Sequence, residues 1–116
     1  MKNVLQIAYL IAALGGGVSQ ALAGSHGERP VGAAVFARSC IACHGIDGAG
    51  AMPGIPDLTD QKGALSKSDK VLLKSIVNGI DSGSSPTPMP AKGGDETLTE
   101  AEARLVLDYI RREFGN

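Results

Sequence analysis

Two cysteines and a histidine stand within five consecutive residues, and these are the side chains of this sequence best suited to chemistry. The segment reads Cys40-Ile41-Ala42-Cys43-His44. On a helix, residues three and four apart share one side, so both thiols and the imidazole point the same way. Each thiol can add to one vinyl group of a single porphyrin, and the imidazole then reaches the iron. The C-x-x-C-H pattern therefore predicts one covalently attached haem c with His44 as an iron ligand.

Three other uses of the two cysteines stay open at this point. A thioredoxin-like pair needs a βαβ setting, and strand patterns are weak along the whole sequence. A structural zinc site normally has four ligands, and only the distant His26 could complete the set formed by Cys40, Cys43 and His44. A plain disulfide suits an exported chain but leaves His44 without a role. Haem attachment explains all three side chains, so we favour it.

The first 23 residues have the pattern of a secretory signal. Lys2 precedes an apolar run from Val4 to Val18 of about 15 residues, shorter than the roughly 20 that span a bilayer. Ala21-Leu22-Ala23 then matches the A-x-A pattern of signal peptidase sites. We expect cleavage after Ala23, a bacterial periplasmic location and no membrane span in the mature protein. An uncleaved membrane anchor is the alternative.

The remaining residues, 24–116, are predicted to form one domain with a thin core. The chain has 116 residues, of which 16 are glycine, 3% are aromatic and none is tryptophan. So short a chain with so few large side chains buries little apolar surface by itself, and a bound cofactor would add to it. The formal net charge of −1 argues against a nucleic-acid partner, which needs a basic surface.

Three helices are predicted in this domain. The first runs from Val31 to Cys43, with Pro30 suited to its first turn and residues 24–29 outside it. The second covers residues 69–78, between a Ser68 cap and a Gly79 stop, and apolar residues from Val71 to Ile80 follow a helical period.

A capping box, Thr99 to Glu102, opens the third predicted helix, which continues to about Phe114. Two loops of roughly 20 residues separate the three helices, and loops of that length in a compact domain normally wrap something. The pattern therefore predicts an all-α fold, with three to four helices and long loops around one haem.

These motifs resemble the class I c-type cytochromes, in particular short bacterial monohaem proteins similar to cytochrome c5 and c-555. In that family a proline twelve residues after the haem histidine offers its carbonyl to the free ring nitrogen, and here that proline is Pro56. The resemblance implies that Leu58 packs against the haem. It also implies that the first and last helices cross, with Gly32 and Phe36 facing Leu105 and Tyr109.

The resemblance further implies a methionine as the sixth iron ligand, between the middle and last helices. Met89-Pro90 occupies that place, and ligation by histidine and methionine raises the reduction potential. Met52 is also followed by proline but lies only eight residues beyond His44. Met52 as the ligand, or an iron with no methionine ligand, are the alternatives to Met89.

Lys62, Lys67, Lys70 and Lys74 form a basic cluster before and within the middle helix. We interpret it as a solvated helix face, and a docking patch for an acidic partner is the alternative.

An iron with two axial ligands has no open position for a substrate, and no catalytic group accompanies the motif, so we expect electron transfer and not an enzyme. The predicted protein is a monomeric periplasmic carrier that moves single electrons between a dehydrogenase and an oxidase or reductase. The first alternative is a haem c subunit of a larger oxidoreductase complex. The second is a five-coordinate haem protein that binds a gas or acts like a peroxidase.

Overall fold

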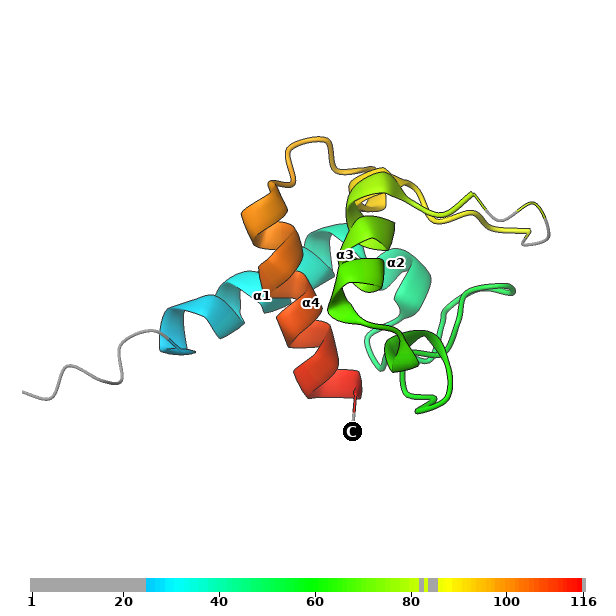
Figure 1. Cartoon of the computed structure of the whole chain (residues 1–116), viewed down its shortest axis with the longest axis horizontal. Coiled ribbons are helices and arrows are strands. Elements are labelled where there is room, and N and C mark those ends of the chain that lie inside the picture. The colour runs from blue at the N-terminus through cyan, green and yellow to red at the C-terminus, as the bar shows by residue number, and fades with distance from the viewer. Residues whose placement is uncertain (1–24, 82, 84–85, 116) are drawn as a thin grey trace, which may run out of the picture.

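The computed structural model describes residues 25–81, 83 and 86–115, and this part of the chain is helical, without a β-strand (Figure 1). The expected all-α fold with three to four helices is confirmed. No helix in the described ranges is long and apolar enough to cross a bilayer, and the predicted signal segment, residues 1–23, lies outside them. The elements are α1 (Ser25–Ser39), α2 (Ile41–His44), the 3-10 turn η1 (Ala64–Ser66), α3 (Asp69–Asn78), the 3-10 turn η2 (Ala91–Gly94) and α4 (Glu100–Phe114).

Helices α3 and α4 have the bounds that their local signals predict. Gly79 follows α3 with a φ of 75°, a left-handed value that suits glycine. Ser68 precedes α3 in an extended conformation, although its side chain makes no capping hydrogen bond. At α4, Thr99 Oγ1 accepts a hydrogen bond from the Glu102 N–H at 3.1 Å, and Glu102 Oε2 accepts one from the Thr99 N–H at 3.0 Å. The predicted capping box is therefore confirmed.

Helix α1 differs from the expected helix at both ends. It begins at Ser25 and includes Pro30, so the prediction that it starts at Val31 is wrong. Residues 27–30 are exposed and present no apolar face, which is why the sequence pattern does not reveal this first part. At the other end, Cys40 has a φ of −124°, outside the helical range. The expected continuous helix to Cys43 is thus divided at the first cysteine of the motif.

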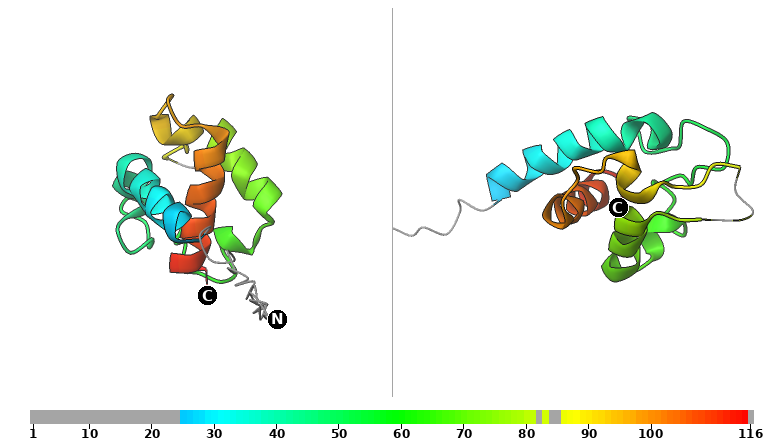
Figure 2. Two further views of the ribbon diagram at one scale, coloured as in Figure 1. Left: turned by 90° about the vertical axis from the view of Figure 1, so that its left-hand side faces the viewer. Right: turned by 90° about the horizontal axis from the view of Figure 1, so that it is seen from above.

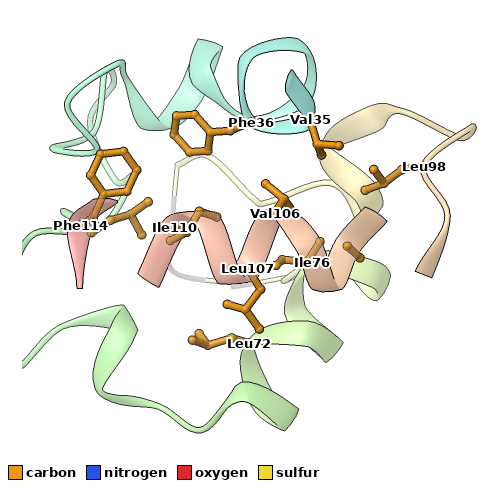
Figure 3. Packing of buried hydrophobic residues seen from close by; sticks show 11 residues of the cluster. Val35, Phe36, Leu72, Ile76, Leu98, Val106, Leu107, Ile110 and Phe114 are labelled. Atoms are coloured by element: carbon orange, nitrogen blue, oxygen red, sulfur yellow. The ribbon is translucent and has the colours of Figure 1, made fainter. Parts of the chain in front are cut away.

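Helix α4 lies between α1 and α3 and contributes to the packing on both sides (Figure 3). Val106 and Ile110 point toward α1, where Phe36 lies, and Leu107 points toward Leu72 of α3. Burying one such side chain fully contributes about 1.5–3 kcal/mol. The buried apolar residues are Val35, Phe36, Leu58, Leu72, Ile76, Leu98, Ala103, Val106, Leu107, Ile110 and Phe114.

Gly32 lets α1 and α4 cross at close range, as the resemblance implied (Figure 2). A Cβ atom on Gly32 would lie 2.8 Å from Tyr109 Cβ and still closer to the carbonyl oxygen of Leu105. One turn further along α1, the ring of Phe36 packs 5.5 Å from the ring of Tyr109 and 5.4 Å from that of Phe114. The predicted crossing of the first and last helices is confirmed.

Arg38, near the end of α1, connects this helix to α4 and to the segment before it. Its guanidinium donates to Asp95 at 3.1 Å and to Glu102 at 2.8 Å. Asp95 also accepts hydrogen bonds from the hydroxyls of Thr97 at 2.5 Å and Ser39 at 3.1 Å. The hydrogen bond from Thr97 and then that from Arg38 are the main reasons that the pKa of Asp95 falls to about 2. Ionised Asp95 therefore holds the segment after η2 against α1.

Replacing Gly32 by alanine should destabilise the haem-loaded protein by about 1–3 kcal/mol, the usual effect of overpacking. The new methyl group would meet the Leu105 carbonyl, which belongs to the α4 backbone. Chemical denaturation followed by circular dichroism measures the change. Gly27→Ala is the matched control in the same helix, because a Cβ there meets nothing within 4 Å. Equal unfolding free energies for the two variants would contradict the close crossing.

Replacing Asp95 by asparagine should lower the stability at neutral pH and reduce the loss of stability in acid. The pKa of Asp95 is about 2 in the folded protein and ordinarily 3.8. Its stabilising contribution is therefore complete above about pH 4 and is lost as the pH falls to about 2. Urea denaturation across this pH range measures the unfolding free energies of the wild type and of Asp95→Asn. The difference between them should shrink toward zero as the pH falls.

Asp108→Asn is the control for the Asp95 variant, since the partner of Asp108 is Arg112 on the same helix, 3.5 Å away. Such exposed pairs contribute little, so this variant should change little at any pH. A stability difference for Asp95→Asn that stays constant down to pH 2 would contradict the role given to Asp95.

Candidate functional site

The C-x-x-C-H motif forms one tight turn after α1. The N–H groups of Cys43 and His44 both donate to the carbonyl of Cys40, at 3.2 and 3.0 Å. The following loop folds back onto this turn, where the Ala51 N–H donates to the Cys43 carbonyl and the Gly50 N–H to the His44 carbonyl, at 2.8 and 2.9 Å. Both cysteines are half-buried and free, not joined in a disulfide. The turn therefore offers two thiols and one imidazole from a single short segment.

Two adjoining cavities, of about 300 and 430 Å³, open beside this turn. Their sizes are typical of sites for organic cofactors. The loop after α2 and the loop after α3 meet at the first cavity, where the Thr87 hydroxyl donates to the Pro53 carbonyl at 3.3 Å. The residues that line both cavities are Cys40, His44, Pro56, Ile80 and Met89.

All six residues that the sequence assigns to the site lie on these cavities. Cys43 lines the first cavity and Leu58 lines the second. The other four line both cavities, and they are Cys40, His44, Pro56 and Met89. Leu58 is buried, and its N–H donates to the Gly48 carbonyl at 2.8 Å, which fixes it beneath the loop. The structure thus brings together residues that are up to 49 positions apart, from Cys40 to Met89.

Burial determines the charge state of His44. It lowers the pKa of the imidazole, because the charged form loses its hydration. The ring is therefore neutral at neutral pH, and the neutral ring is the form that binds a metal. Its Nδ1 atom is buried without a hydrogen-bond partner. Leaving a buried polar atom without a hydrogen bond costs about 1–3 kcal/mol. The unpaired Nδ1 atom therefore fits an imidazole whose final orientation is set by a bound cofactor.

The hydrogen bond expected from His44 to the Pro56 carbonyl is not formed in this structure. Pro56 lines both cavities together with His44, so the two residues are brought to the same place. Nδ1 of His44 nevertheless has no partner. The sequence spacing brings Pro56 into range but does not set the rotation of the ring, which in metal sites depends on the bound metal as well. That Pro56 accepts this bond in the haem-loaded protein stays a prediction.

Burial also raises the pKa of the Cys40 thiol to about 11, against a smaller lowering effect of Arg38. The thiol is accordingly protonated and uncharged at neutral pH. With a neutral His44 beside it, this wall of the cavity carries no charge. Such a wall suits the apolar face of a porphyrin, because burying an unpaired charge is costly.

Met89 is positioned by a backbone bridge directly after α3. The Ile80 N–H donates to the Met89 carbonyl at 2.8 Å, and the Met89 N–H donates to the Ile80 carbonyl at 3.1 Å. Gly79 permits this approach, since a Cβ there would lie 2.5 Å from the Met89 carbonyl and 2.7 Å from the Ala91 nitrogen. Met52, the alternative ligand, is 42% exposed and lines neither cavity. The arrangement favours Met89.

Ile80, Lys62 and Lys67 are cavity residues that the sequence alone does not assign to the site. The helical period includes Ile80, yet this residue lies beyond α3 and lines both cavities. The preceding helix stop, Gly79, is the signal that Ile80 leaves the helix. Lys62 and Lys67 line the second cavity, whereas Lys70 and Lys74 line neither of the two. Nothing local distinguishes these pairs of lysines in the sequence.

The residues present fit a covalently bound haem c. Cys40 and Cys43 would hold it through thioethers, His44 and Met89 would supply nitrogen and sulfur to the iron, and Leu58 would pack against it. When bound, the haem supplies an iron that accepts and releases one electron. The chain itself would provide the attachment, two ligands and an uncharged wall formed by Cys40 and His44.

Comparison with known proteins points to the same cofactor. Residues 28–110 match the family model described as cytochrome c oxidase, cbb3-type, subunit III. The chain is 37% identical over 90 residues to the Cbb3-type cytochrome c oxidase subunit FixP of Bradyrhizobium sp. (strain ORS 278), covering 75% of this chain and 31% of that protein. It is 34% identical over 93 residues to the fructose dehydrogenase cytochrome subunit of Gluconobacter japonicus, covering 73% of this chain and 19% of that protein.

A third relative is the lupanine 17-hydroxylase (cytochrome c) of Pseudomonas sp, 35% identical over 74 residues, which are 64% of this chain and 9% of that protein. The chain therefore spans less than a third of the length of these three relatives. The matches confirm the predicted haem c, covalently bound and containing iron. They support the wider group of c-type cytochromes and do not single out the cytochrome c5 or c-555 type.

Replacing Met89 by alanine should convert a low-spin haem spectrum into a high-spin one, because the iron loses its sulfur ligand. The ferric protein should lose the sulfur-to-iron band at the red end of its spectrum, and the ferrous protein should bind carbon monoxide rapidly. Met52→Ala is the matched control and should leave the spectrum unchanged. If the band survives in Met89→Ala, another residue is the sixth ligand.

Proposed function

The chain belongs to the family of cytochrome c oxidase, cbb3-type, subunit III, and from this membership we propose that it passes single electrons through its haem c as part of a larger oxidoreductase assembly. The relatives compared above bear the names of a cytochrome c oxidase subunit and a dehydrogenase cytochrome subunit. These names support the role of a subunit better than that of a freely diffusing carrier. The partner of this chain would be an oxidase, a reductase or a dehydrogenase.

Electron transfer without catalysis is proposed because His44 and Met89 line the same two cavities. With both as ligands, the iron has no open position at which a substrate could bind. His44 is neutral and half-buried, and Met89 is held by backbone hydrogen bonds, so both ligands can keep their places when the iron changes charge. The joint placement of these two residues is the observation on which the proposal rests.

The surface around the first cavity supports a lasting contact with a partner. None of the residues that line this cavity is ionised at neutral pH, given that burial holds His44 neutral. Ile46, in the loop directly after His44, is 83% exposed, and Met52 and Ile80 are 42% and 40% exposed. Exposed apolar residues are typical of the centre of a protein interface. We refer to these three exposed apolar residues, Ile46, Met52 and Ile80, as the apolar rim.

A periplasmic location is part of the proposal. It rests on the signal pattern in residues 1–23. Two cysteines in an exported chain otherwise tend to form a disulfide, and haem attachment gives them a different use.

Purification of a tagged chain from its own cells tests the proposed assembly. Membranes and soluble fraction are separated, the membranes are extracted with mild detergent, and the tagged protein is captured and passed over a size-exclusion column. A subunit should elute with an oxidase, reductase or dehydrogenase at a fixed ratio. Elution of the haem-loaded protein as a monomer would favour the free carrier, the role to which the resemblance to cytochrome c5 and c-555 points.

Charged substitutions on the apolar rim make this test specific. Ile46→Glu should reduce co-elution with the partner, because a carboxylate would be buried in the interface without a counter-charge. Val71→Glu is the matched control, since Val71 is an exposed apolar residue, 47% accessible, on α3 and lines neither cavity. An equal loss of co-elution with both variants would contradict a contact through the rim.

A further inference from the structure

The two cavities differ sharply in charge. His44 lines both, and the other side chains that line the first cavity carry no formal charge. The lining of the second includes two cationic side chains, Lys62 and Lys67, and no carboxylate. They flank η1, so both come from one short segment of the chain.

Other hydrogen-bond donors on this side of the second cavity are already engaged. The Ser66 hydroxyl donates to the Gly63 carbonyl at 2.7 Å, and the Ser75 hydroxyl donates to the Val71 carbonyl at 3.0 Å. Each hydroxyl has a single proton to donate, so neither can also serve an anion without breaking its bond. The backbone N–H groups of Lys62, Gly63, Ser66 and Lys67 likewise donate within the loop.

The two ammonium groups, by contrast, form no ion pair among the described residues. Four arginines of the same part of the chain, Arg38, Arg104, Arg111 and Arg112, each contact a carboxylate. Within the described part of the chain, Lys62 and Lys67 are therefore cations without an ion-pair partner in the lining of a largely apolar cavity.

The acidic residues near these lysines already accept hydrogen bonds or form an ion pair. Asp57 accepts hydrogen bonds from the N–H and hydroxyl of Thr59, and Asp60 accepts one from the Lys62 N–H. Asp69 pairs with Arg111 at 2.5 Å. None of these three carboxylates lines either cavity. They do not place a negative charge between the lysines and the space inside.

Arg111 of α4 holds the lysine-bearing segment in place. Its guanidinium donates to the Leu65 carbonyl at 2.9 Å and to the Lys67 carbonyl at 2.7 Å. The loop around η1 is thereby fixed to the same helix that packs against α1 and α3. The lysine positions are set by the core of the protein and not by the loop alone.

We propose that Lys62 and Lys67 bind the two propionate carboxylates that haem carries on one edge, and so orient the haem in the second cavity. This edge of the cofactor is anionic, and ammonium groups form strong charge-assisted hydrogen bonds with carboxylates. The cysteines agree with this orientation, because Cys43 lines only the first, uncharged cavity. The inference depends on the haem c of the proposed function but not on any partner protein.

The midpoint potential of the isolated haem-loaded protein, measured by spectroelectrochemistry between about pH 5 and pH 9, tests this assignment. Lys62→Gln and Lys67→Gln should each lower the potential, because a positive charge near the haem favours the reduced iron. The midpoint potential of each variant should also change with pH within this range, whereas the wild-type potential should stay constant. The pKa of a carboxylate rises when its cationic partner is removed, so a propionate would then titrate within this range.

Lys74→Gln is the matched control, because Lys74 is an exposed lysine of α3 that lines neither cavity. It should leave the potential and its pH dependence unchanged. Lys62→Arg and Lys67→Arg should keep the wild-type behaviour, which separates loss of charge from loss of packing. The sulfur-to-iron band of Met89 verifies in every variant that the iron ligands are intact.

Potentials and pH profiles of Lys62→Gln and Lys67→Gln that match those of Lys74→Gln would overturn the proposal. The two singly substituted proteins are each decisive, so the test does not require a double variant. Since no partner protein takes part, this result is independent of whether the chain elutes as a subunit or as a monomer.

Discussion

The close crossing of α1 and α4 at Gly32 is the contact on which the rest of the structure depends. The motif with both cysteines and His44 begins one residue after the end of α1, so the position of α1 on α4 fixes the position of the turn. The other side of α4 carries Leu107 against Leu72 of α3, and α3 leads directly to the bridge that holds Met89 (Figure 3). Both expected iron ligands are therefore positioned from the same helix. A shift of α1 along α4 would move His44 relative to Met89 without altering either local turn.

Charge divides the site into two regions with different tasks. Burial keeps Cys40 and His44 uncharged, and no ionised residue lines the first cavity. Lys62 and Lys67 place positive charge at the second cavity, and Arg111 holds the carbonyls of Leu65 and Lys67 in the same loop. An anionic group binds more favourably beside cations, and an apolar ring binds more favourably where no charged group has to lose its hydration. The exposed apolar residues of the rim suit contact with another protein.

Features that depend on neighbouring residues could be predicted from the sequence, and those that depend on distant ones could not. The capping box at Thr99 and the glycine stop at Gly79 act within one helical turn, so the bounds of α3 and α4 are predicted correctly. The early start of α1 has no apolar pattern to reveal it, and the break at Cys40 lies within an otherwise helical composition. The spacing between His44 and Pro56 brings them to one cavity, but the rotation of the imidazole is not encoded by spacing. That Lys62 and Lys67 share a cavity with His44 and Met89 depends on contacts between segments far apart in the sequence.

The cavities and the core are parts of one apolar region, which explains how so small a chain can hold a large cofactor. Leu58, Leu72, Ile76, Leu107 and Ile110 are buried core residues, and all of them also line the second cavity. A haem placed there extends the core and adds the apolar contact that a short chain with few aromatic residues lacks. Thioethers to Cys40 and Cys43 would perform a different task, since they would keep the haem attached to the turn of the motif. Packing against these core residues would keep water away from the iron.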